Sequence, residues 1–177
     1  KRLKPEIKII VGGFHIQVSK SFSELCARLP EIDYVISGDL ETSIEDIYNN
    51  KVQKGVVHYS ETVDMSLIYP PVYNTLDLKQ FDGRIMLSTS RGCPQKCEFC
   101  ATNPIPFKKS NIDGVLETFK MYSNKLYRKH VNLIHFNDPT LNFTKKRIND
   151  LLDGLKAMNN DIEVKGDTIL KNLDDDI

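Results

Sequence analysis

The sequence has 177 residues, of which 40% are hydrophobic and 27% are charged, a balance that excludes a largely disordered chain. Its 24 basic and 24 acidic residues cancel, so no net charge attracts the chain to nucleic acid or to an anionic membrane surface. No apolar run is long enough for a membrane span, and the first residues lack signal-peptide features. We therefore expect a cytoplasmic location, no nucleic-acid partner and no membrane span. Because the chain opens on Lys1 without an initiator Met, we also expect a fragment of a longer protein.

The first predicted elements are a strand and a helix. Residues 7–11 form a mostly β-branched run typical of a buried parallel strand, and Gly12 and Gly13 end it. Residues 19–29 place apolar side chains three and four positions apart, which predicts a helix that closes at Pro30.

The same strand and helix order then repeats. Residues 33–36 predict a second strand, residues 37–39 a turn, and residues 42–48 a second helix. Such alternation predicts a parallel sheet with helical crossovers, in which two strands alone are too few for a stable layer. We expect residues 1–50 to be the C-terminal part of a doubly wound, Rossmann-like α/β domain.

Residues 51–82 lose any period and contain Pro70 and Pro71, which predicts a linker. A second α/β region, residues 83–177, is expected to follow it. The predicted strands there are 84–88, 131–136 and 162–165, and the predicted helices are 112–126 and 145–158. This order predicts the first βα units of a partial TIM-like barrel, whose functional face lies at the loops after its strands.

Three cysteines lie on one short loop directly after the strand at 84–88. Cys93, Cys97 and Cys100 stand at spacings of four and three, and Cys26 lies far away in sequence. Iron–sulfur clusters are held by cysteine thiolates, and a cubane with three protein ligands leaves its fourth iron open. The spacing therefore predicts a catalytic cluster.

Two other kinds of cysteine site fit less well. A structural zinc site needs four ligands, usually in two pairs, and the nearest downstream histidines are His130 and His135. A ferredoxin-like carrier needs a fourth cysteine, and Cys26 belongs to the other predicted domain.

Cys93, Cys97 and Cys100 match the CxxxCxxC motif of the radical S-adenosylmethionine superfamily, which this region resembles. Phe99 fits the aromatic position before the third cysteine, and residues 88–92 resemble the TSRGCP-type turn of some members. The resemblance implies a [4Fe-4S] cluster that cleaves S-adenosylmethionine reductively, with Phe99 as a wall for adenine.

The loop after the strand at 131–136 contains Asn137, Asp138 and Pro139. It resembles the acidic loop of the cobalamin-dependent branch, which implies that Asp138 lies near the methionyl group of S-adenosylmethionine. Asn-Asp-Pro is also common turn chemistry, so a simple turn stays open. Asn142 is a candidate cap for the next helix.

The turns at Gly12, Gly13 and Gly38 resemble those of cobalamin-binding domains attached to radical enzymes, which implies that they approach cobalamin closely. Ordinary turn geometry explains the same glycines equally well. His15 is not assigned to cobalt, because the family's ligating histidine lies in a different loop.

These features predict a radical S-adenosylmethionine enzyme, with cobalamin as a further cofactor. The reaction would be methyl transfer, cyclisation or rearrangement on a small-molecule or lipid-like substrate, with flavodoxin or ferredoxin as electron donor. The alternative is a non-catalytic α/β binding module stabilised by zinc or an iron–sulfur cluster.

Overall fold

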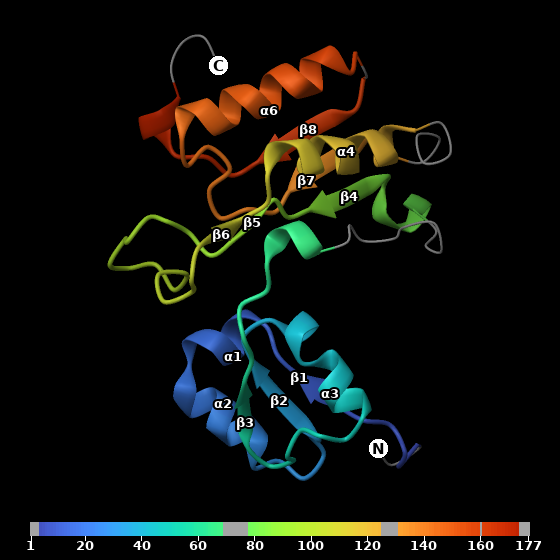
Figure 1. The fold of residues 1–177 in the computed structure, drawn as a ribbon, viewed down its shortest axis with the longest axis vertical. Helices are drawn as coiled ribbons and strands as arrows, with labels where there is room; N and C mark the ends of the chain where they lie inside the picture. The colour runs from blue at the N-terminus through green and yellow to red at the C-terminus, as the bar shows by residue number, and fades with distance from the viewer. Residues whose placement is uncertain (1–3, 69–77, 125–130, 160, 174–177) are drawn as a thin grey trace. The chain divides into compact units, whose positions relative to one another are not determined.

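The computed structural model describes residues 4–68, 78–124, 131–159 and 161–173. The chain divides into two compact units, Lys1–Asp64 and Met65–Ile177 (Figure 1). The first unit thus extends beyond residue 50, into the segment predicted as a linker. Pro70 and Pro71 lie outside the described residues.

The first unit contains a parallel sheet of three strands in the order β1 (Ile10–Val11), β2 (Tyr34–Ser37) and β3 (Val57–Tyr59). Val35 of β2 is paired with Val11 on one side and Val57 on the other. β1 and β2 lie within the predicted strands, whereas β3 was not predicted. Three residues are too few to show a period, and their strand conformation depends on pairing with β2.

Helices cover both faces of this sheet. α1 (Phe14–Val18) and α2 (Lys20–Ala27) lie on one side, and α3 (Ile44–Tyr48) lies on the other, after the 3-10 turn η1 (Leu40–Thr42) (Figure 1). Neighbouring residues of a strand point to opposite faces. Val35 accordingly joins the core on the α2 side, and the flanking residues of β2 join the core on the α3 side: Tyr34 and Ile36.

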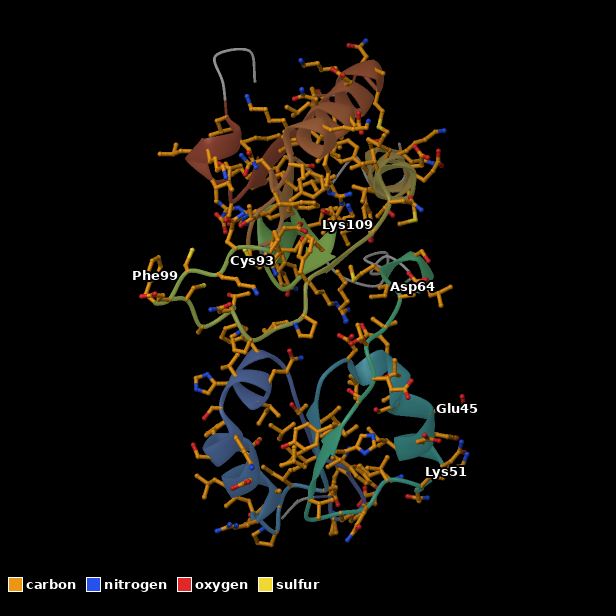
Figure 2. All side chains as sticks on the ribbon, turned by 60° about the vertical axis from the view of Figure 1, so that its left-hand side comes forward. Glu45, Lys51, Asp64, Cys93, Phe99 and Lys109 are labelled. Atoms are coloured by element: carbon orange, nitrogen blue, oxygen red, sulfur yellow. The ribbon has the colours of Figure 1, made fainter. Side chains whose placement is uncertain are left out.

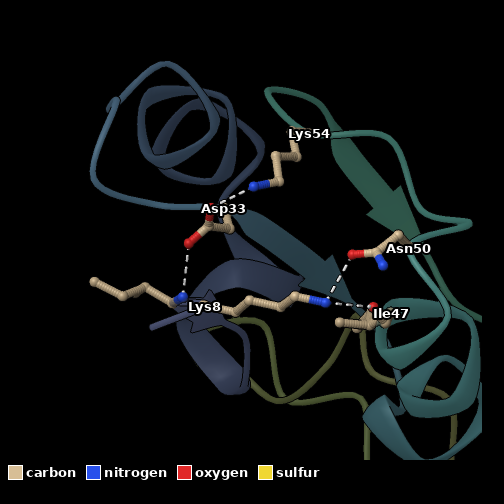
Figure 3. Close-up of polar contacts among 6 residues, drawn as sticks. Lys8, Asp33, Ile47, Asn50 and Lys54 are labelled. Atoms are coloured by element: carbon tan, nitrogen blue, oxygen red, sulfur yellow. Dashed lines mark hydrogen bonds and ion pairs between the residues drawn. The ribbon is translucent and has the colours of Figure 1, made fainter. Parts of the chain in front are cut away.

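Polar contacts tie the start of β2 to the chain on both sides of it (Figure 3). The buried carboxylate of Asp33 accepts hydrogen bonds from the Ile9 amide at 2.8 Å and from Nζ of Lys54 at 2.7 Å. Nζ of Lys8 donates to Oδ1 of Asn50 at 2.7 Å. These contacts join the segments that precede β1 and β3.

The second unit contains another parallel sheet, in the order β4 (Arg84–Leu87), β7 (Leu133–Phe136) and β8 (Glu163–Gly166) (Figure 1). α4 (Ile112–Ser123) and α6 (Lys145–Ala157) are the crossover helices between these strands. The predicted elements are confirmed, with α4 described as far as Ser123. The mixed α/β class with parallel sheets is confirmed as well. The Rossmann-like domain at the N-terminus and the partial TIM-like barrel stay predictions.

The apolar faces of α4 and α6 pack against one face of this sheet. Burial of each large aliphatic or aromatic side chain contributes about 1.5–3 kcal/mol, so this core dominates the stability of the unit. Its largest fully buried members include Ile85, Ile134, Phe136, Phe119, Tyr122 and Leu151.

Hydrogen bonds to side chains define where these helices begin. Asn111 accepts from the Gly114 amide at the start of α4, and Thr144 accepts from the Arg147 amide at the start of α6. The prediction that Asn142 caps α6 is therefore wrong, because Thr144 takes that position. Its amide group instead bonds to the backbone N–H and C=O of Ile169, at 2.7 and 2.8 Å, and joins the loops after β7 and β8.

A short antiparallel pair, β5 (Ser90–Arg91) and β6 (Lys108–Lys109), was also not predicted. It closes the loop 92–107, which we call the cysteine loop. Three further 3-10 turns are η2 (Met65–Leu67), η3 (Leu78–Phe81) and η4 (Leu170–Asn172). Across the described ranges, no helix is long and apolar enough to cross a membrane.

Candidate functional site

The cysteine loop begins just beyond the carboxyl end of β4, in the second unit. Cys97 is exposed, Cys93 and Cys100 are half-buried, and all three are free thiols. Gly92 makes the turn into the loop with φ 68°, and a Cβ there would lie 2.6 Å from the carbonyl oxygen of Pro106. The turn therefore requires glycine, for its backbone conformation and for this close approach.

The three thiols suit a thiolate-bound cluster in number and type. Hydrogen bonds from the side chain and backbone of Thr102 lower the pKa of the Cys100 thiol, which favours the thiolate that binds metal. Among the described residues, no three His, Cys, Asp or Glu side chains converge as a metal site. The number and type of the donors fit an iron–sulfur cluster, because such clusters are held by cysteine thiolates. The loop would have to bring the three thiols together for them to bind one.

Thr140, from the loop after β7, contacts the first of these cysteines. Its Oγ1 lies 3.3 Å from Sγ of Cys93, and it also donates to the carbonyl oxygen of Pro139 at 2.7 Å. Thr140 is buried, so solvent does not compete for its hydroxyl. The end of β7 therefore contributes a polar group beside a predicted ligand.

Asp138 lies two residues earlier and is only 1% exposed. Its carboxylate accepts from the Thr89 amide at 3.1 Å, from the Thr89 hydroxyl at 3.0 Å and from the Ser90 hydroxyl. Burial raises the pKa of the Asp138 carboxyl, and the hydrogen bonds from Ser90 and Thr89 partly oppose that rise. The structure thus brings Asp138 to the residues that lead into the cysteine loop.

Arg147 of α6 reaches the same place and is only 7% exposed. Its guanidinium donates to the backbone carbonyl of Thr89 at 3.3 Å, to the Thr89 hydroxyl at 3.2 Å and to the carbonyl of Ser110 at 2.9 Å. Burial lowers the pKa of Arg147, and the nearby Asp138 charge opposes that effect. A buried cation and a buried carboxyl group are therefore joined through Thr89.

Phe99 lies at the outermost part of the cysteine loop and points away from the ribbon (Figure 2). Its side chain is 93% exposed, so it contributes little to the apolar core. A large aromatic residue in such a position is available to a ligand, which its predicted role as an adenine wall requires.

The predicted cobalamin glycines lie in the first unit, at the carboxyl ends of β1 and β2. A Cβ at Gly38, where φ is 126°, would lie 2.5 Å from Oγ and 2.7 Å from the carbonyl oxygen of Ser60. A Cβ at Gly12 would lie 3.3 Å from the carbonyl of Ile36, and one at Gly13 would meet nothing within 4 Å. Packing against the chain thus explains Gly38, and only Gly13 faces open space.

His15, which was not assigned to cobalt, packs its ring edge-on against Phe22 with centroids 5.1 Å apart.

Sequence reasoning missed Thr89, Thr140 and Arg147. The pattern at residues 88–92 resembles a turn, and the small hydroxyl side chains there are also suitable partners for a buried carboxylate. Arg147 follows the cap Thr144 by three positions, which places it beside the apolar stripe of α6. That position is the one sequence signal that could have indicated its burial.

No protein-family model matches the chain. The chain is similar to bacteriochlorophyllide d C-12(1)-methyltransferase of Chlorobaculum tepidum, with 28% identity over 170 residues that cover 89% of this chain and 36% of the relative. It is 25% identical to tRNA-2-methylthio-N(6)-dimethylallyladenosine synthase of Thermodesulfovibrio yellowstonii, over 81% of this chain and 33% of the relative.

A third similarity is to the probable dual-specificity RNA methyltransferase RlmN of Prochlorococcus marinus, with 31% identity over 44% of this chain and 22% of the relative. The chain thus spans about a third or less of the length of these relatives. Together with the cysteine spacing, the similarities support the radical S-adenosylmethionine superfamily. They support S-adenosylmethionine and a [4Fe-4S] cluster as its cofactors.

Proposed function

We propose that this chain is part of a radical S-adenosylmethionine enzyme that uses a [4Fe-4S] cluster held by Cys93, Cys97 and Cys100. The observation that carries the proposal is the placement of these three thiols on one loop at the carboxyl end of a parallel strand. That edge is where α/β folds of this kind place their reactive groups. The similarity to two methyltransferases and a methylthio-group synthase favours the same chemistry.

When bound, the cluster would supply one electron and an open iron for S-adenosylmethionine. The three thiolates would hold it, and the exposed ring of Phe99 would cover the adenine. The carboxylate of Asp138 is engaged by Thr89 and Ser90, so it supports the loop directly. A contact between Asp138 and the methionyl group would have to form in addition to these bonds.

The finer proposal is a cobalamin-dependent methyl transfer. The relative from Chlorobaculum tepidum matches 89% of this chain, which is more than either unit alone, so the similarity includes residues of both units. The open space around Gly13, at the carboxyl edge of the first sheet, would admit a cofactor. The substrate would be a small or lipid-like molecule, and flavodoxin or ferredoxin would supply the electron.

The decisive experiment is anaerobic reconstitution with iron and sulfide, followed by electron paramagnetic resonance of the reduced protein with and without S-adenosylmethionine. We expect a cubane signal that shifts when S-adenosylmethionine is added. A cluster whose signal ignores S-adenosylmethionine would contradict the proposal. Cys97→Ala should lose iron and sulfide, and the matched control Cys26→Ala, in the first unit, should retain both.

The alternative function is a binding module in which metal only stabilises the loop. This module would use the same three thiols, because zinc is also bound by cysteine sulfur, and it would need a fourth ligand to complete the tetrahedral site. Zinc has a filled d shell and gives colourless protein, whereas an iron–sulfur cubane gives brown protein. Colourless protein that binds one zinc and takes up no iron would favour the binding module.

A further inference from the structure

Thr89 and Ser110 form the neck of the cysteine loop. Thr89 directly precedes β5, Ser110 directly follows β6, and the Ser110 amide donates to the Thr89 carbonyl at 2.9 Å. Every residue of the loop, including the three cysteines, lies between these two positions. The geometry of the neck therefore decides how the loop leaves and rejoins the sheet.

Arg147 contacts both sides of this neck from a different element. Its Nη1 donates to the Ser110 carbonyl, and its Nη2 donates to the carbonyl and hydroxyl of Thr89. The planar guanidinium reaches the two chain segments with two separate nitrogens in a fixed fork, whereas a lysine ammonium would have to reach both from a single nitrogen. The ring of Phe143 also lies against the guanidinium, with Cζ 5.1 Å from the ring centroid.

Asp138 completes the arrangement from the end of β7. The Thr89 hydroxyl donates its one proton to Asp138 and accepts from Arg147, so one side chain connects the two charged groups. Thr89, Asp138 and Arg147 are all buried. A hydrogen bond to a charged group is stronger in this low-dielectric interior than at the surface.

We propose that Arg147, with Asp138, clamps the neck of the cysteine loop and acts as a positioning residue for the three thiols. The clamp itself rests on the contacts above, and its consequence for cluster retention rests on the proposed function. Constraining both ends of a loop reduces the conformations that it samples. The clamp therefore keeps the three thiols near one another and slows loss of the cluster.

The test compares Arg147→Met, Arg147→Lys and the double variant Asp138→Asn with Arg147→Met in the full chain. The double variant removes both buried charges, so it separates a loose neck from a general charge imbalance. Lys146→Met is the matched control, because Lys146 is the exposed neighbour of Arg147 on α6 and pairs with Asp150.

Amide hydrogen exchange of the metal-free protein, read by mass spectrometry, reports the clamp without any cofactor. We expect exchange in residues 89–110 to rise about tenfold in Arg147→Met and in the double variant, because a lost hydrogen bond to a charged group changes a local equilibrium by at least that factor. Arg147→Lys should be intermediate, and Lys146→Met should match the wild type. Exchange that rises equally in β4, β7 and the loop would show general destabilisation and overturn the clamp.

Iron loss to a chelator after reconstitution reports the consequence for the cluster. We expect loss about tenfold faster in Arg147→Met and in the double variant, in parallel with exchange. A looser neck with unchanged iron loss would overturn the positioning role. Wild-type protein that takes up no cluster would overturn the proposed function, and with it the positioning role, while exchange would still decide whether the clamp exists.

Discussion

The hydroxyl of Thr140 lies 3.3 Å from the sulfur of Cys93, across 47 positions of sequence. The hydroxyl has one proton and two acceptors within reach, the Cys93 sulfur and the Pro139 carbonyl. A thiol can donate to the hydroxyl, but a ligating thiolate can only accept. Thr140 is thereby placed to donate to Cys93 when a cluster is bound.

Thr140→Val should lower the reduction potential of the reconstituted cluster, because a hydrogen bond to a ligating sulfur stabilises the reduced, more negative state. A shift on the order of 60 mV corresponds to a tenfold change in a one-electron equilibrium. A redox titration followed by electron paramagnetic resonance measures it. Thr140→Ser keeps the hydroxyl and should stay near the wild type, and an unshifted potential in Thr140→Val would show that the bond does not act on the cluster.

Phe99→Ala should leave the metal-free protein as stable as the wild type, within about 0.5 kcal/mol, because the ring is 93% exposed. The same change should weaken the binding of S-adenosylmethionine, measured as the concentration of S-adenosylmethionine needed to shift the cluster signal. Loss of one aromatic stacking partner, at about 0.5–1.5 kcal/mol, predicts binding that is about two- to thirteenfold weaker. Phe99→Tyr keeps the ring and should bind normally. Equal affinity in Phe99→Ala would remove the adenine wall from the proposal.

Asp138→Asn should flatten the pH dependence of unfolding. Burial raises the pKa of Asp138 above the ordinary 3.8, so the folded state favours the protonated form more than the unfolded chain does. Its contribution to stability is full below pH 3.8 and is lost as pH rises through the raised pKa. Urea unfolding followed by circular dichroism, from pH 3.8 to above the raised pKa, measures how the free energy of unfolding changes with pH. Asp150→Asn, at an exposed carboxylate of α6, is the control, and identical slopes for wild type and Asp138→Asn would contradict the burial effect.

Gly38→Ala should destabilise the first unit more than Gly13→Ala does. Both glycines have positive φ, which costs a residue with a side chain about 1–3 kcal/mol. At Gly38 the added methyl group would also press on Ser60, which adds about 1–3 kcal/mol of overpacking. Urea unfolding of both variants measures the difference. If the proposed cobalamin contact is correct, Gly13→Ala should also weaken cobalamin binding in an absorbance titration, and equal binding would exclude that contact.

The strands and helices of the second unit were predictable because their signals are local. The apolar stripe of α6 and the apolar run at residues 85–87 before the cysteine loop each lie within a few turns or residues of chain. β3 and the β5–β6 pair were not predictable in the same way. Each has two or three residues, which carry no period, and each becomes a strand only by pairing with a partner elsewhere in the chain.

The sequence by itself determined the candidate ligands, because Cys93, Cys97 and Cys100 are close along the chain and must share one loop in any fold. It did not determine what holds that loop. Arg147 meets Ser110 across 37 positions and Thr89 across 58, and Asp138 meets Thr89 across 49. Only the crossovers between parallel strands bring these residues together, and the burial that results makes their charges and hydrogen bonds matter.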